Sequence, residues 1–371
     1  MRRQKMSVPF YNFNELHNEE FRNLVKERIG NIIDNNAYVE GEYNHKFEQE
    51  FAKMQKAKHC LLVANGTDAL EIALKVYDVK PGDHVGVPGI TFYATAEAVL
   101  NIGAIPVWVD VEPLTGLICP NSLMRVHKEY NLKSVMPVHI YGLPADMENI
   151  NNFCIENNIS IVEDAAQAHG ATYSNGEPVG SFNNLTTFSF YPTKNLSAFG
   201  DAGCILTQSD ELAQKILVER NHGRGNELAM GRNSRCDHMQ AAVLHLKLSK
   251  ISQYNAMRKE VAAKYHNALK DLPLALTPVN FLKSSSWHLY PTQVESKELR
   301  IKLSNHLKEQ NIGHTPFYEK SLSQEPALSQ YKGESEIADD FAGRTLCLPM
   351  NPFISDDDVN YVANAVRNFF S

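Results

Sequence analysis

The sequence lacks the features that mark several large classes of protein. None of its apolar runs approaches the length that crosses a bilayer, and its basic start, with Arg2 and Arg3, is not followed by the apolar stretch of a secretion signal. Acidic residues outnumber basic ones, and the net charge of −7 disfavours a nucleic-acid-binding surface. We therefore expect a cytoplasmic protein that engages neither membranes nor nucleic acids.

Cysteine is scarce and scattered. The six cysteines form no C-x-x-C pair and no His/Cys spacing typical of a metal site, so we expect reduced, mostly buried thiols and no bound metal. Hydrophobic residues make up 43% of the chain and charged residues 21%, which is an ordinary globular composition. Because 371 residues exceed the usual size of one hydrophobic core, we expect two domains.

Short apolar runs alternate with helical segments in the first half of the chain. The predicted strands are 60–63, 84–87, 105–109, 134–138, 160–162 and 186–190, and the predicted helices between them are 68–76, 94–102, 121–130 and 147–157. This alternation predicts an α/β fold with a largely parallel sheet that is covered by helices on both faces. Ligands of such sheets bind at the carboxyl ends of the strands.

The flanking segments follow other patterns. An extended arm at 8–11 precedes two amphipathic stretches, and this whole region before the sheet could lie over a neighbouring subunit or over the smaller domain. The predicted elements outside the sheet are helices at 15–34, 45–54, 299–310 and 356–369, a long helical stretch at 235–266 that is broken or bent near Ser252, and strands at 286–294 and 345–348. We predict an N-terminal arm with a large α/β domain over 1–250 and a small α+β domain over 251–371.

A lysine follows the last strand of the alternating region. Lys194 lies between the aromatic end of that strand and a glycine-rich turn at 200–203. Desolvation in such a place lowers the pKa of an amine and frees its lone pair for attack on a carbonyl, as in Schiff-base enzymes. Taken alone, however, a solvated surface lysine is the commoner interpretation.

Two earlier strand ends carry groups that suit a phosphate and a planar ring. Gly66 and Thr67 stand at a helix start, where free backbone N–H groups bind phosphate, although Thr67 or Asp68 could simply cap the helix. Phe92 follows the next strand and could stack on a ring, although an aromatic is more often part of the core.

Asp164 follows the fifth strand. A carboxylate in an apolar setting is costly to bury unless it meets a cation, and a protonated pyridine nitrogen would be such a partner. A structural carboxylate that caps a loop is an equally good interpretation of this residue alone. An amine, a carboxylate, an aromatic and a phosphate cradle on successive strand ends are nevertheless the parts that hold pyridoxal phosphate.

The joint order of these parts resembles that of a known family. The chain is similar to the DegT/DnrJ/EryC1/StrS family of sugar aminotransferases, enzymes of fold type I that depend on pyridoxal 5'-phosphate, from about Pro9 to Phe370. The segments that carry the resemblance are NGTDAL (65–70), PGITFYATAEAV (88–99), IPVWVDVEP (105–113), VEDAAQAHGA (162–171), SFYPTKNLSAFGDAG (189–203) and GRNSRCDHMQAA (231–242).

The resemblance implies roles for residues around the cofactor ring. Lys194 would hold the cofactor as a Schiff base and then carry the proton between substrate and cofactor. Asp164 would pair with the pyridinium nitrogen. Gln167 would contact the ring hydroxyl, and Phe92 would stack on the ring.

The resemblance also implies how the phosphate is held. Gly66, Thr67 and Ser189 would bind it from one subunit, and Asn233 would reach it from the neighbouring subunit. The implied unit is therefore a homodimer with composite active sites.

The implied reaction moves an amino group from L-glutamate to a nucleotide-linked keto sugar. Members with histidine in place of the lysine perform dehydration, so Lys194 favours transamination. The SFYPTKNL and GDAG segments resemble the branch acting on dTDP-linked 3-keto-6-deoxyhexoses for surface polysaccharides, such as the O-antigen of lipopolysaccharide, or for antibiotics. A 4-keto substrate linked to dTDP, UDP or GDP is the main alternative, and a non-catalytic regulator on the same scaffold is a more remote one.

The substrate side of the resemblance is less complete. The family's Tyr-Pro-x-Pro-Leu-His run is replaced here by a segment from Tyr318 to Ser323, so only Tyr318 is kept as a candidate sugar contact. One or more of four clustered arginines could pair with the diphosphate, although arginines at the surface or at a dimer interface are as good an interpretation. They are Arg220, Arg224, Arg232 and Arg235.

Overall fold

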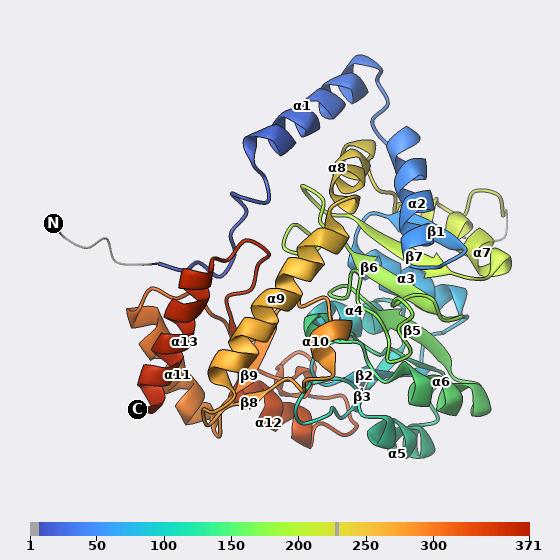
Figure 1. Ribbon diagram of the computed structural model, residues 1–371. Coiled ribbons are helices and arrows are strands. Elements are labelled where there is room, and N and C mark those ends of the chain that lie inside the picture. Colours follow the sequence, from blue (N-terminus) through green and yellow to red (C-terminus); the bar gives the residue numbers. More distant parts are fainter. Residues whose placement is uncertain (1–6, 227–229) are drawn as a thin grey trace.

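A seven-stranded sheet forms the centre of the computed structural model, which describes residues 7–226 and 230–371 (Figure 1). The strand order is β1-β7-β6-β5-β4-β2-β3. β7 runs antiparallel to both neighbours, and every other neighbouring pair is parallel, so the predicted largely parallel sheet is confirmed. The strands are β1 (His59–Val63), β2 (His84–Pro88), β3 (Ile105–Val109), β4 (Ser134–Val135), β5 (Ser160–Asp164), β6 (Leu185–Ser189) and β7 (Gly203–Thr207).

Helices cover both faces of this sheet. One buried cluster joins it to α3, α4 and α7, and another joins it to α2, α5, α6 and α8. The helices are α1 (Glu19–Asp34), α2 (Glu42–Met54), α3 (Gly66–Val76), α4 (Tyr93–Asn101), α5 (Pro120–Tyr130), α6 (Met147–Glu156), α7 (Asp210–Arg220), α8 (His238–Leu248), α9 (Ile251–Leu269), α10 (Phe281–Ser284), α11 (Lys297–Glu309), α12 (Glu336–Arg344) and α13 (Asp356–Phe370), with short 3-10 turns η1 (Ile140–Gly142) and η2 (Leu322–Gln324).

Several predicted elements differ from those observed. The elements that were not predicted are β7, β8, α7, α10 and α12. β7 begins at Gly203, inside the glycine-rich turn, and no helix separates it from β6. β4 ends at Val135, and Pro137, which has no backbone N–H, follows two residues later. The predicted break in the long helical stretch is confirmed: it lies at Ser249 and Lys250, close to Ser252.

A second sheet lies in the C-terminal part of the chain. Three antiparallel strands in the order β10-β9-β8 pack with α11, α12 and α13. The strands are β8 (Ala275–Leu276), β9 (Tyr290–Gln293) and β10 (Thr345–Leu348). Figure 1 shows α9 running between the two sheet regions. The division at residue 250 falls in the break before α9 and stays a prediction.

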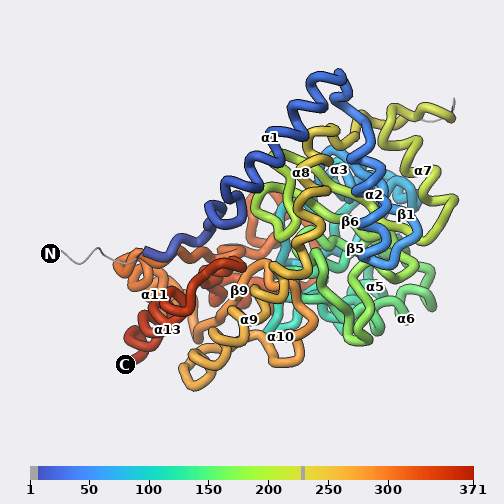
Figure 2. Tube along the Cα trace, turned by 45° about the horizontal axis from the view of Figure 1, so that its top comes forward, coloured from blue at the N-terminus to red at the C-terminus, as the bar shows by residue number. Residues whose placement is uncertain are grey.

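The N-terminal arm lies over this smaller sheet region. The N–H of Val8 donates to the Asn311 carbonyl at 3.1 Å, and the N–H of Gly313 donates to the Val8 carbonyl at 2.7 Å. A Cβ at Gly313 would lie only 2.2 Å from the nitrogen of Phe10, so any residue other than glycine would clash with the arm at this position. After the arm, α1 reaches away along the outside of the molecule (Figure 2). The basic start of the chain lies outside the described residues.

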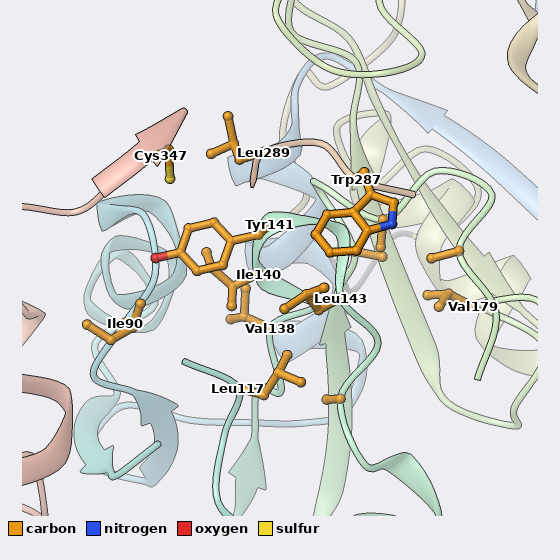
Figure 3. Close-up of a cluster of buried hydrophobic side chains, with 14 of the residues drawn as sticks. Ile90, Leu117, Val138, Ile140, Tyr141, Leu143, Val179, Trp287, Leu289 and Cys347 are labelled. Atoms are coloured by element: carbon orange, nitrogen blue, oxygen red, sulfur yellow. The ribbon is translucent and has the colours of Figure 1, made fainter. Parts of the chain in front are cut away.

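One hydrophobic core joins the two sheet regions. Figure 3 shows Tyr141 and Trp287 among aliphatic side chains, with Leu289 and Cys347 contributed from the C-terminal part. The hydroxyl of Tyr141 donates to the Phe317 carbonyl, which ties the large sheet region to the segment before Tyr318. Over residues 7–226 and 230–371, no helix combines the length and apolar character that a bilayer span requires.

Candidate active site

A cleft of about 840 Å³ opens where the parallel strands end. Its lining includes eight of the nine predicted site residues: Gly66, Thr67, Phe92, Asp164, Gln167, Ser189, Lys194 and Tyr318. Strand register explains this convergence, because Gly203 of β7 pairs with Val63 of β1 on one side and with Ser189 of β6 on the other. The segments that follow β1, β5 and β6 therefore meet at one edge of the sheet.

The start of α3 forms a cradle beside β6. Asn65, not Thr67 or Asp68, caps the helix: its Oδ1 accepts the Asp68 N–H at 2.8 Å. Thr67 is thus free of the capping role that the sequence allowed. The first N–H groups of a helix have no partner inside the helix and lie at the positive end of its dipole, so this end of the cleft suits a phosphate.

Gly66 lets the helix start approach β6 closely. A Cβ at Gly66 would lie 2.7 Å from the Cβ of Ser189. A Gly66→Ala variant should therefore push the cradle open and weaken retention of a bound phosphate group about tenfold, since overpacking typically costs 1–3 kcal/mol. Dialysis of the loaded protein followed by measurement of the remaining cofactor absorbance checks this.

Gly30 supplies the matched control for that substitution. It lies in α1, and nothing stands within 4 Å of the position of its Cβ. Gly30→Ala should stabilise its helix by about 1 kcal/mol and leave retention unchanged. Equal retention in wild type and Gly66→Ala would show that the cradle does not hold the phosphate.

Asp164 ends β5 as a buried carboxylate that no cation of the described chain pairs with. It is 6% exposed, and its oxygens accept the Thr95 hydroxyl at 2.9 Å and the Ala166 N–H at 3.1 Å. Two neutral donors orient the group without neutralising it. A buried carboxylate held in this way suits a cationic partner inside the cleft.

Lys194 is held on a loop that packing fixes at both ends. Phe190 precedes it and packs edge-on against Phe47 of α2, with ring centroids 5.2 Å apart. Asn195 follows it and donates to the Ser286 carbonyl at 2.8 Å. Burial lowers the pKa of Lys194 to about 8, and the negative charge of Asp164 opposes that shift. A sizeable fraction of the amine is therefore neutral near physiological pH.

Aromatic and amide groups complete the walls. The Phe92 ring is 55% exposed and faces the cleft, and its centroid lies 6.3 Å from that of Tyr318. The Gln167 side chain accepts the Tyr141 N–H at 2.6 Å, and its Nε2 lies 3.5 Å from the Tyr318 hydroxyl. A planar ring bound in the cleft could stack on Phe92 with one face and would have the Gln167 amide at its edge.

Asn233 and the four arginines do not belong to the described lining of the cleft. Asn233 is exposed, and its Oδ1 accepts two N–H groups of Arg235. Arg232 pairs with Asp68 and Glu71 on α3, and Arg220 pairs with Glu48 at 3.1 Å. These pairs favour structural roles for Arg220 and Arg232, and neither Arg224 nor Arg235 belongs to the described lining of the cleft.

The sequence did not reveal two residues that line the cleft, Tyr11 and His288, or Thr95, which contacts Asp164 from outside the described lining. Tyr11 comes from the N-terminal arm, far from any strand end, and no motif marks it. His288 comes from the segment before β9. Thr95 orients Asp164, and its spacing of four from Thr91, whose hydroxyl lies 2.7 Å away, is the only sequence signal that could have indicated it.

The comparisons with known proteins agree with this geometry. The model of the DegT/DnrJ/EryC1/StrS aminotransferase family matches residues 19–367. The chain is 36% identical to the dTDP-3-amino-3,6-dideoxy-alpha-D-galactopyranose transaminase of Aneurinibacillus thermoaerophilus, covering 98% of this chain and 99% of that one. It is 35% identical, with coverage of 98% and 99%, to a protein of Geobacillus stearothermophilus named pleiotropic regulatory protein.

Solved structures share the fold as well. The structure of DesV from S. venezuelae in complex with a ketimine intermediate superposes with a TM-score of 0.92 at 34% identity, covering 98% of this chain and 99% of that one. The aminotransferases of the matching family depend on pyridoxal 5'-phosphate.

The residues present fit this cofactor. The glycine cradle suits its phosphate, the unpaired carboxylate of Asp164 suits its ring nitrogen, and the desolvated amine of Lys194 suits its aldehyde. Both the sequence match over 19–367 and the geometry of the cleft thus lead to one assignment. The chain belongs to the DegT/DnrJ/EryC1/StrS aminotransferase family and is a pyridoxal phosphate-dependent enzyme of that family.

Proposed function

We propose that this protein transfers an amino group from L-glutamate to a nucleotide-linked keto sugar, with a dTDP-linked 3-keto-6-deoxyhexose as the favoured acceptor. The observation that carries the proposal is the convergence of a desolvated amine, an unpaired carboxylate and a helix-start cradle in one cleft of about 840 Å³. The transaminase of A. thermoaerophilus, whose name gives a dTDP-3-amino sugar, supports the choice of acceptor.

The roles of the cleft residues follow from their chemistry. When bound, pyridoxal phosphate supplies the aldehyde that condenses with amines and the ring that stores an electron pair. Nζ of Lys194 would carry a proton from the donor carbon to the cofactor in one half-reaction and from the cofactor to the acceptor carbon in the other, which its lowered pKa permits. The Asp164 carboxylate keeps the ring nitrogen protonated, and Thr95 keeps that carboxylate in place.

The other lining residues bind and orient. Gly66, Thr67 and Ser189 would hold the phosphate, Phe92 would stack on the ring, and Gln167 would contact the ring hydroxyl. Tyr318, which closes the cleft beside Gln167, is our candidate for a contact with the acceptor sugar. The six free thiols of the chain support a reducing compartment such as the cytoplasm as the place of reaction.

We also propose that the working unit is a homodimer. Asn233 is exposed and outside the cleft of its own chain, which supports a role at the phosphate of a neighbouring copy. Asn233→Ala should then weaken cofactor retention, and mixing it with a Lys194→Ala variant should restore part of the activity through hybrid sites. Activity of the refolded mixture against that of each variant alone checks this, and no restoration would contradict the composite site.

The acceptor is tested by product analysis. Incubation with L-glutamate and a panel of dTDP-, UDP- and GDP-linked 3-keto and 4-keto sugars should yield an amino sugar from the dTDP-linked 3-keto substrate with the highest kcat/KM. A preference for a 4-keto sugar would move the assignment to that alternative. No product from any member of the panel would favour the regulator, to which the name of the G. stearothermophilus relative points.

A further inference from the structure

Arg258 of α9 is a buried cation that has no carboxylate partner among the described residues. It is 9% exposed, and its Nη1 donates to the carbonyl oxygens of Trp287 and Met350, both at 3.3 Å. Its Nε and Nη2 donate to no described atom, yet they are not sealed from solvent. A guanidinium has five N–H donors, so the one on Nε and the two on Nη2 remain available for an anion. Because buried charges in proteins are normally paired, an anionic partner is expected here.

Arg258 lies next to the cleft. Trp287, which accepts its hydrogen bond, directly precedes His288 of the cleft lining. The pKa of His288 is held well below its usual range by burial, and the charges of Lys194 and Arg258 add to this. Burial raises the pKa of Tyr11, another lining residue, to about 12, and the charge of Arg258 opposes that rise.

The two ends of the cleft differ in the charged side chains that the structure describes there. Asp68 and Glu71 line it at α3, and Arg232 pairs with both of them. Arg258 and Lys194 are cations near the end formed by Tyr11 and His288. Arg258 is not itself among the described lining residues, but it adjoins that end through Trp287, and there an incoming carboxylate would find a guanidinium without a carboxylate partner.

Helix α9 holds Arg258 in a fixed relation to the reacting lysine. Asn255, three residues earlier on the same face, donates to the His169 carbonyl at 2.7 Å and accepts from the Asn195 side chain at 3.2 Å. Asn195 directly follows Lys194. The helix that presents the guanidinium is thus bonded to the loop that presents the amine, as substrate positioning requires.

We propose that Arg258 binds a carboxylate of the amino acid donor at the end of the cleft bounded by Tyr11 and His288. The inference rests on the proposed function, because it assumes an amino acid as the donor. The rival explanation is structural: Arg258 ties α9 to the segments around Trp287 and Met350 and never meets a substrate.

The two half-reactions separate these explanations. In Arg258→Gln, the second-order rate constant for conversion of the cofactor by L-glutamate should fall about 100-fold, since charge-assisted hydrogen bonds to a carboxylate are lost. The reaction of the pyridoxamine-loaded variant with the keto sugar should stay within about twofold of wild type. Arg258→Lys should recover part of the loss. Calorimetric titration with glutarate, an unreactive dicarboxylate, should show weaker binding to Arg258→Gln.

Arg300 supplies the control for structural damage. It is also buried, at 3% exposed, and donates to the Gly343 carbonyl at 2.7 Å and to the Glu319 carboxylate at 3.5 Å, and neither Arg300 nor Glu319 belongs to the described cleft lining. Arg300→Gln should lower the midpoint of thermal unfolding and leave both half-reactions unchanged. An equal fall in both half-reactions of Arg258→Gln, or an unchanged glutamate reaction, would overturn the inference.

The wild type reports separately on the proposed function. If it responds to L-alanine but not to L-glutamate, the donor assignment fails, and the alanine rate then tests Arg258, because alanine carries only the α-carboxylate. If instead the wild type accepts both donors, a glutamate rate that falls in Arg258→Gln while the alanine rate does not would assign the guanidinium to the side-chain carboxylate of glutamate. Equal rates of variant and wild type with every donor would refute the role of Arg258.

Discussion

Lys194→Ala should abolish transamination, with a fall in turnover of about 10⁴-fold or more, because one amine both holds the cofactor and moves the proton. The visible absorption of the bound cofactor should shift, since no Schiff base to the protein can form. Steady-state assay with glutamate and a keto sugar, together with the absorption spectrum of the purified variant, measures both effects.

Lys247 is the matched control for this loss. Burial lowers its pKa to about 7, its Nζ donates to the Ser197 hydroxyl at 2.9 Å, and it lies over the rings of Phe21 and Phe199. It is therefore another desolvated amine, but it does not line the cleft. Lys247→Met should keep the spectrum and most of the activity, whereas loss of the spectrum in that variant alone would reassign the cofactor lysine.

Asp164→Asn should lower turnover about 10²- to 10³-fold while the protein still binds cofactor, because the amide keeps the size of the side chain but loses its charge. The negative charge of Asp164 raises the pKa of Lys194, so its removal should lower that pKa further below about 8. The neutral amine is the base, so the rising limb of the pH–rate profile should move to lower pH. Rates of the glutamate half-reaction across pH measure both changes.

Asp201 serves as the comparison for Asp164. It also lines the cleft but is exposed, so solvent screens its charge. Asp201→Asn should leave turnover within about threefold of wild type and leave the pH profile in place. Full activity in Asp164→Asn would refute the role of that carboxylate in holding the ring nitrogen charged.

The sequence predicted those features of the cleft that depend on order along the chain. Gly66, Phe92 and Lys194 each follow a strand and Asp164 ends one, and parallel strands bring such residues to one edge whatever the details of packing. β7 escaped prediction because it begins inside the glycine-rich turn at 200–203 and no helix separates it from β6, yet it is the strand that joins β1 to β6.

Residues whose role depends on long-range packing could not be predicted. Tyr11 reaches the cleft only because the arm pairs with residues near Ile312, some 300 positions later in the chain. In the sequence Arg258 looks like an ordinary charged residue of a helix. Only the structure shows that it is buried beside Trp287 without a carboxylate partner among the described residues. Neither contact leaves a local pattern, because both join distant parts of the chain.

Reduction of the loaded enzyme with borohydride tests the central claim most directly, because it fixes the cofactor to the lysine that carries it. Digestion and mass spectrometry should then place one cofactor adduct per chain on the peptide that contains Lys194. An adduct on the peptide of Lys247 or of any other lysine, with Lys194 unmodified, would contradict the account.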